Sequence, residues 1–133
     1  MKKMPIILAA IVTVAVAILL IVLFCRRTNI PASSCAVLKY RQKEKSVVLE
    51  MTKEDSEELR RLLNHRFLYY DNPSCGFTQG VSISFDDSVY CFACDGCNVI
   101  YDCESQMYFT IKQTEYDGLA DILLRYGLTF PCI

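Results

Sequence analysis

An uncharged apolar run near the N-terminus constrains this chain more than any other feature. The run extends over the 21 residues from Met4 to Phe24, and Thr13 is its only mildly polar member. A helix of that length measures about 31 Å, which matches the hydrocarbon core of a bilayer, roughly 30 Å thick. A secretory signal peptide has a shorter apolar core followed by small residues at the cleavage site, whereas Cys25, Arg26 and Arg27 follow here. We therefore predict that residues 1–24 form a single-pass signal anchor whose residues 4–24 contact the lipid bilayer.

Basic residues on both sides of this run give opposing signals about its orientation. Lys2 and Lys3 favour a cytoplasmic N-terminus, whereas Arg26, Arg27 and further basic residues downstream favour the reverse. The positive-inside rule is weaker for long domains, and a short Met-Lys-Lys head before a long apolar run is typical of a bacterial signal anchor. We expect the C-terminal part to be extracytoplasmic, in a bacterial cell envelope.

The remaining residues are enough for one small domain. Polar residues and Pro31 interrupt any periodicity over 25–35, which we interpret as a linker before a domain at 36–133. Apolar–polar alternation predicts strands at 36–40, 46–51, 81–85, 89–94, 97–102 and 107–111, with a further short aromatic strand at 67–70. Capping patterns predict helices that begin after Thr52, with Asp55 as the partner carboxylate, and at Thr114, with Asp117. This order predicts an α+β domain, a small antiparallel sheet with two helices packed on one face.

Cysteines carry the only distinctive chemistry in the sequence. Cys91, Cys94 and Cys97 follow a C-x2-C-x2-C spacing, and Cys103 lies six residues further on. One hypothesis is a zinc or iron–sulfur site made by these four thiolates, although alternation along a strand would place Cys91 and Cys94 on opposite faces. A second hypothesis is a redox dithiol at Cys94 and Cys97, although this pair lies on a hairpin turn rather than at a helix N-terminus.

The third hypothesis, which we prefer, is a framework of structural disulfides. Asp95-Gly96 is a strong signal for a two-residue hairpin turn, which would make Cys94 and Cys97 cross-strand neighbours within disulfide reach. The same register places Cys91 and Cys103 too far apart to bond. Cys75 and Cys132, in irregular segments, form a second candidate pair, although spacing does not fix the connectivity. Disulfide bonds require an oxidising compartment outside the cytoplasm.

Three segments together carry a resemblance. The residues 73–77 (Pro-Ser-Cys-Gly-Phe), the segment 91–97 and the tail 130–132 (Phe-Pro-Cys) resemble a pattern in small bacterial proteins that are membrane-anchored or exported. The resemblance covers about residues 46–133. It implies anchoring or export and brings no activity, ligand or catalytic residue with it.

Composition narrows the function further. The single histidine, His65, removes most catalytic triads, and a net charge of −1 argues against a nucleic-acid partner. We expect no enzymatic activity and no cofactor, but a membrane-anchored domain that binds an unidentified ligand or an envelope protein. The alternative is a thiol-based redox or metal-binding protein that uses the Cys91–Cys103 cluster. Tyr90 and Tyr108 would form an aromatic binding surface if both face the wet side of the sheet.

Overall fold

The computed structural model describes residues 3–32, 35–77 and 80–131, and it shows the expected α+β fold. An N-terminal apolar helix precedes a six-stranded sheet and two further helices. The strand order is β2-β1-β3-β4-β5-β6, and all neighbouring strands are antiparallel. The elements are α1 (Met4–Phe24), β1 (Ala36–Gln42), β2 (Lys45–Glu50), α2 (Lys53–Leu63), β3 (Val81–Phe85), β4 (Ser88–Phe92), β5 (Val99–Asp102), β6 (Met107–Thr110) and α3 (Gln113–Leu124).

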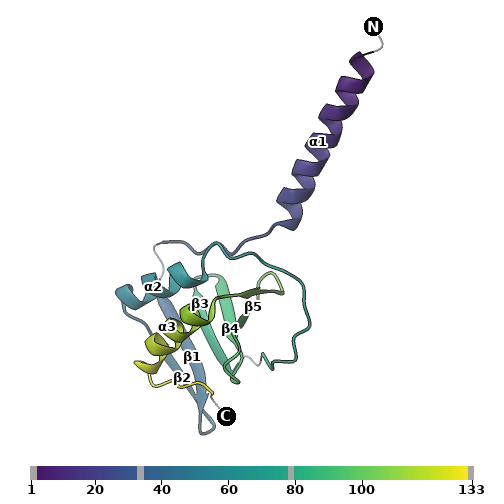
Figure 1. The fold of residues 1–133 in the computed structure, drawn as a ribbon. Helices are drawn as coiled ribbons and strands as arrows, with labels where there is room; N and C mark the ends of the chain where they lie inside the picture. Colours follow the sequence, from purple (N-terminus) through teal and green to yellow (C-terminus); the bar gives the residue numbers. More distant parts are fainter. Residues whose placement is uncertain (1–2, 33–34, 78–79, 132–133) are drawn as a thin grey trace.

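Helix α1 extends away from the rest of the molecule (Figure 1), and none of its residues is buried. It is long and apolar enough to cross a membrane, so it is a candidate membrane span or signal. The one polar side chain within it, Thr13, donates its hydroxyl proton to the carbonyl oxygen of Ala9 at 2.9 Å. A bond of this kind satisfies the hydroxyl inside the helix and leaves an apolar outer surface.

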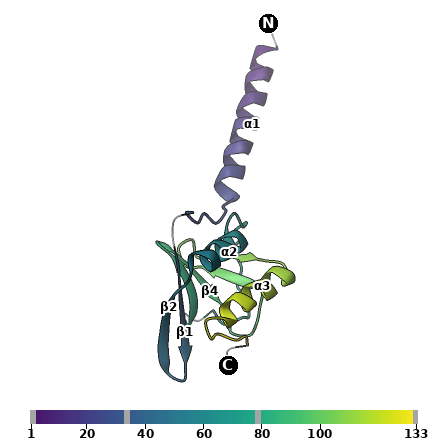
Figure 2. The same cartoon turned by 90° about the vertical axis from the view of Figure 1, so that its left-hand side faces the viewer.

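Helices α2 and α3 lie together over one face of the sheet (Figures 1 and 2). Alternation along the strands supplies that face with apolar side chains, because successive residues point to opposite sides. The core therefore forms between this face and the buried sides of the two helices. Its largest fully buried members are Leu38, Leu59, Leu63, Ile83, Phe85, Tyr90, Phe92, Ile100, Phe109, Ile111, Leu119 and Leu123.

The start of α2 follows its predicted capping pattern, whereas the start of α3 does not. The hydroxyl of Thr52 accepts the Asp55 amide N–H at 3.2 Å, as expected. Helix α3 begins one residue before Thr114, and the carboxylate of Glu115, not Asp117, accepts the amide N–H of Lys112 at 2.8 Å. The residue that caps α3 is therefore Lys112, two residues before the predicted Thr114.

Two charged contacts join α2 to α3. Arg66, just after α2, makes a bidentate pair with Glu115 at 2.8 and 3.2 Å, and this contact lowers the pKa of the Glu115 carboxyl group. At the other end, Asp55 accepts hydrogen bonds from Arg125 at 2.6 Å and from the Tyr126 hydroxyl at 2.5 Å. The two helices are thus held together at both ends as well as through the core.

The stretch after α1, which we expected to be a linker, is partly docked on the domain. Thr28 donates its amide N–H to the Arg66 carbonyl at 2.9 Å and its hydroxyl to the Leu63 carbonyl at 2.6 Å. Ile30 is 2% exposed, and its amide N–H donates to Asn64 Oδ1 at 2.8 Å. These contacts attach the chain below α1 to the C-terminal end of α2, so this stretch is not a free tether.

The two-residue hairpin predicted at Asp95-Gly96 is wrong. Phe92 pairs with Ile100, so β4 and β5 are joined by a loop over residues 93–98. Phe92 and Ile100 are 1% and 0% exposed, so both must face the helices. A register with Cys94 opposite Cys97 would pair Phe92 with Val99 and turn Ile100 away from the core, because a one-residue slip reverses the side-chain faces.

Two smaller expectations also fail. Residues 67–70 make isolated bridges, Arg27 with Phe67 and Tyr69 with Tyr108, and no strand. The alternation at 81–85 predicts that Ser82 faces water, away from Val81 and Ile83, but Ser82 is 6% exposed. The second face of the sheet is partly covered, since Phe77 from the segment before β3 packs edge-to-face against Tyr108 with 5.3 Å between ring centroids.

Two buried tyrosines give a matched test of this core. The Tyr40 hydroxyl donates to the Tyr126 carbonyl at 2.9 Å, whereas the buried Tyr116 hydroxyl has no hydrogen-bond partner among the described residues. We expect Tyr40→Phe to lower the free energy of unfolding by about 1 kcal/mol, and Tyr116→Phe to raise it by about 1 kcal/mol, since an unpaired buried polar group is costly. Urea denaturation of the two variants measures both changes. Equal losses in both variants would show that the Tyr116 hydroxyl is paired.

Candidate functional site

The observed register brings Cys91 and Cys103 together on the sheet face opposite the helices. Cys91 pairs with Tyr101, and the amide N–H of Cys103 donates to the Val89 carbonyl at 3.0 Å, so the two cysteines are diagonal neighbours. Their Sγ atoms are 3.0 Å apart. The expectation that they lie too far apart to bond is wrong, because it rested on the other register.

A second cluster joins Cys75, Asp95 and Cys97. One ligand atom from each, two Sγ atoms and a carboxylate oxygen, lies within 4.8 Å of the other two. Cys75 comes from the irregular segment before β3, and Asp95 and Cys97 come from the β4–β5 loop. The Asp95 carboxylate also accepts the amide N–H of Cys97 at 3.0 Å, which fixes the turn of this loop around Gly96 at φ +82°.

These contacts differ from the disulfide pairs expected from the sequence. Cys75 and Cys97 carry free thiols in the structure, so the Cys94–Cys97 bond is not formed. Cys94 is itself engaged in a disulfide bond. Cys132, the expected partner of Cys75, lies outside the described residues. The physical reason is again the register, since the wider loop removes Cys94 and Cys97 from opposite positions of a ladder.

The four-cysteine metal site is likewise not gathered in one place. Within residues 3–32, 35–77 and 80–131, the group that could hold an ion is the Cys75–Asp95–Cys97 cluster, and it includes neither Cys91 nor Cys103. Cys91 and Cys103 lie together on the sheet, and Cys97 lies with Cys75. The C-x2-C-x2-C spacing therefore distributes its thiols among different contacts rather than around one centre.

One thiol of each cluster, Cys91 and Cys75, is held in its protonated form. Burial and the hydrogen bond with Cys103 raise the pKa of Cys91 to about 12. The hydrogen bond with Cys97, followed by burial and the nearby Asp95, raises the pKa of Cys75 to about 12. A catalytic cysteine needs the opposite shift, because the thiolate is the nucleophile.

The expected aromatic surface does not exist as one surface. Tyr90 aligns with Asp102 and Met107 across the sheet, so it faces the helices, whereas Tyr108 is the next residue after Met107 and faces the other side. Tyr90 is 1% exposed, and burial raises its pKa to about 12. Tyr108 stacks instead on Tyr101, with 5.0 Å between the ring centroids.

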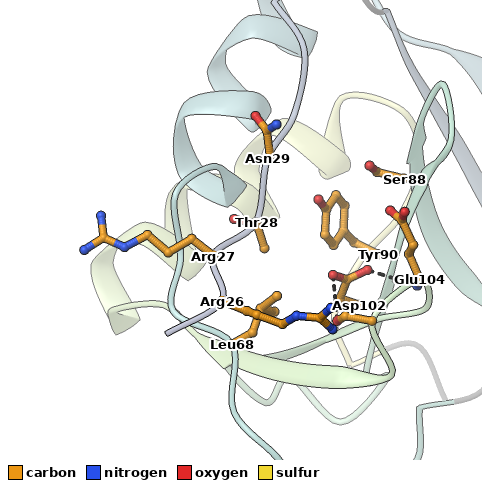
Figure 3. A pocket seen from close by; sticks show the side chains of 10 residues that line it. Arg26, Arg27, Thr28, Asn29, Leu68, Ser88, Tyr90, Asp102 and Glu104 are labelled. Atoms are coloured by element: carbon orange, nitrogen blue, oxygen red, sulfur yellow. Dashed lines mark hydrogen bonds between the residues drawn. The ribbon is translucent and has the colours of Figure 1, made fainter. Parts of the chain in front are cut away.

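A pocket that the sequence did not reveal lies where the stretch after α1 meets the domain (Figure 3). Its volume is about 460 Å³. One wall is the chain just after α1, and the others come from β4 and from the end of β5. The lining residues are Arg26, Arg27, Thr28, Asn29, Leu68, Ser88, Tyr90, Asp102, Glu104 and Ser105.

Opposite charges line this pocket. The Arg26 side chain extends into it, whereas Arg27 points away (Figure 3), with its guanidinium carbon 4.0 Å from the centre of the Phe67 ring. Asp102 is 6% exposed, and its carboxylate accepts the Glu104 amide N–H at 3.1 Å and the Ser105 hydroxyl at 2.9 Å. Within the described part of the chain Asp102 makes no salt bridge. The pocket thus offers a buried carboxylate without a cationic partner.

Alternation was the one sequence signal that could have pointed to Asp102. The pattern that turns Ile100 inward turns Asp102 inward as well, and an aspartate on the core side of a strand is unusual. The remaining lining residues come from four separate stretches of chain, at 26–29, 68, 88–90 and 104–105. The docking of the stretch after α1 completes the pocket, and no local pattern encodes that docking.

The raised pKa of Cys91 predicts slow alkylation. In the reduced, folded protein at pH 8, we expect iodoacetamide to modify buried Cys91 at least about 100-fold more slowly than exposed Cys35, because few Cys91 thiols are ionised. The Cys91 rate should rise as the pH approaches 12. Mass spectrometry of peptides from timed reactions measures both rates, and in guanidinium chloride they should converge. Similar rates for the two thiols in the folded protein would contradict the assignment.

Comparison with known proteins gives no relative. No protein-family model, curated protein or solved structure matches this chain. Any function must therefore be argued from the pocket, the cysteine contacts and the apolar helix.

Proposed function

We propose that this protein is a single-pass, membrane-anchored binding domain of a bacterial cell envelope, with residues 25–133 outside the cytoplasm. The observation that carries the proposal is the charged pocket at the junction of anchor and domain. Its wall at residues 26–29 begins two residues after the end of α1 at Phe24. If α1 crosses the bilayer, this pocket faces the membrane surface.

The pocket chemistry favours a small polar ligand with charges of both signs. Arg26 supplies a guanidinium for an anionic group, and Asp102 and Glu104 supply carboxylates for a cationic group. The Asp102 carboxylate accepts two hydrogen bonds but makes no salt bridge within the described residues, so a ligand ammonium group would add a charge-assisted hydrogen bond there. A zwitterion that carries a phosphate and an amine has this chemistry, whether it is free or part of a lipid headgroup.

The alternative, a thiol-based redox or metal-binding function, is less well supported. The 3.0 Å contact between Cys91 and Cys103 favours it. The raised pKa of Cys91 opposes it, because a redox-active cysteine is activated by a lowered pKa. A binding function makes no such demand on the thiols, and the cysteines then serve the stability of the domain.

Cell labelling tests the orientation. In intact cells that express the Cys25→Ser variant, we expect a membrane-impermeant maleimide to label exposed Cys35 without lysis. The double variant Cys25→Ser, Cys35→Ser is the control and should lose this labelling. Labelling of Cys35 only after lysis would place the domain in the cytoplasm and contradict the proposal.

Phosphoethanolamine is a suitable probe of the pocket. We expect millimolar phosphoethanolamine to raise the melting temperature of the detergent-solubilised chain by a few degrees, since a ligand of the native state stabilises it. Asp102→Asn retains an oxygen for the Glu104 amide but removes the charge, and it should abolish this shift. Glu50→Gln, which removes an exposed carboxylate on β2, is the matched control and should retain it. No shift in the wild-type chain, or the same shift in Asp102→Asn, would contradict binding at this pocket.

A further inference from the structure

We propose that Cys75 and Cys97 form a disulfide bond that fastens the irregular segment before β3 to the loop between β4 and β5. This pairing differs from both pairs that the sequence favours. It rests on the extracytoplasmic placement under the proposed function, because the bond needs an oxidising compartment. It does not rest on the identity of the ligand.

Proximity of the two sulfur atoms is the first support. The Sγ atoms of Cys75 and Cys97 belong to a cluster whose atoms lie within 4.8 Å of one another. Both side chains are partly exposed, so an oxidant can reach them. A bond between them requires the sulfurs to close from this contact to about 2.05 Å.

Contacts made by neighbouring residues in the chain hold the segment of each cysteine in place. Two residues after Cys75, Phe77 packs edge-to-face against Tyr108 at 5.3 Å. On the other side, the Asp95 carboxylate binds the amide N–H of Cys97 at 3.0 Å, and Asn98 Nδ2 donates to the Ile111 carbonyl at 2.8 Å. The two sulfurs therefore meet because their segments are fixed, and not through a chance rotamer.

The chemistry is a two-step thiol–disulfide exchange. One cysteine thiolate attacks a sulfur of an oxidant disulfide, forms a mixed disulfide and releases one thiolate of the oxidant. The second cysteine thiolate then attacks the protein sulfur of that mixed disulfide and releases the other oxidant thiolate. Two protein thiols are oxidised, one oxidant disulfide is reduced to two thiols, and the two protons pass to those thiols. Oxidised glutathione serves as the oxidant in vitro, and a disulfide-bearing oxidoreductase belongs to the same chemical class.

A metal site is the competing use of the same atoms. A structural zinc site takes four protein ligands, and this cluster supplies three within the described residues. Cys94, three residues before Cys97, is engaged in a disulfide bond and therefore does not supply a fourth thiolate ligand. The shortage of ligands favours a disulfide over a dithiolate metal site.

Digestion before aspartate places the two cysteines of each candidate pair in different fragments. The full chain in detergent is reduced, placed in a glutathione redox buffer, alkylated and cut without reductant by the protease Asp-N. This places Cys75 in fragment 71–85, Cys91 and Cys94 in 87–94, Cys97 in 95–101, Cys103 in 102–116 and Cys132 in 121–133. We expect fragment 71–85 to be linked to fragment 95–101 in most molecules.

Other digestion products would overturn the proposal. A link from 95–101 to 87–94, a link from 71–85 to 121–133, or alkylation of both Cys75 and Cys97 would each exclude the bond. Binding of one zinc ion per reduced chain would assign the cluster to a metal instead, if both thiols then resist alkylation until the protein is unfolded. If the link forms in glutathione buffer but both thiols are reduced in cells, the bond stands and the extracytoplasmic placement fails.

Variants give an independent measurement. Cys75→Ser should leave Cys97 open to alkylation and lower the melting temperature by roughly 10 °C, since the lost bond closes a loop of moderate length. Reductant should remove this difference between the variant and the wild type. Cys103→Ser is the matched control and should leave the link between 71–85 and 95–101 intact. A melting temperature unchanged by Cys75→Ser in the absence of reductant would contradict the bond.

Discussion

Burial of one face of the sheet beneath α2 and α3 sets the register of the strands. Leu38, Ile83 and Tyr90 align across β1, β3 and β4, and Phe92, Ile100 and Phe109 align across β4, β5 and β6. All six are almost fully buried. Each large apolar side chain contributes about 1.5–3 kcal/mol when it leaves water. A one-residue slip of β5 would expose Ile100, which costs more than an unfavourable turn.

This balance explains which features of the fold could be predicted. The Thr52 cap and the alternation of β3 depend on neighbouring residues, and the sequence predicts both. The β4–β5 hairpin depends on a competition between the Asp95-Gly96 turn signal and the burial of Ile100. Turn chemistry is local and visible in the sequence, whereas burial depends on the position of the helices. The local signal was therefore misleading, and the Cys94–Cys97 pair derived from it is wrong too.

The docked stretch after α1 has the same origin and a functional consequence. Thr28 and Ile30 bind the end of α2 through hydrogen bonds to the backbone and to Asn64. Nothing in their own sequence specifies these bonds, because the partners lie more than thirty residues away. The docking makes residues 26–29 one wall of the charged pocket. The pocket is thus formed jointly by the stretch after α1 and the sheet, and its geometry depends on how that stretch docks on the domain.

The contact between Cys75 and Cys97 lies where the backbone lacks regular partners. The segment 71–77 contains no strand or helix, and residues 93–98 form an irregular loop between β4 and β5. Strands are held by their ladders, and loops of this kind have no ladder to restrain them. Small domains bury a smaller share of their surface than large ones, so they gain more from a covalent link between such segments. A bond from Cys75 to Cys97 would restrain both segments at once. A bond from Cys94 to Cys97 would close only a short loop within one of them and would not restrain the segment before β3.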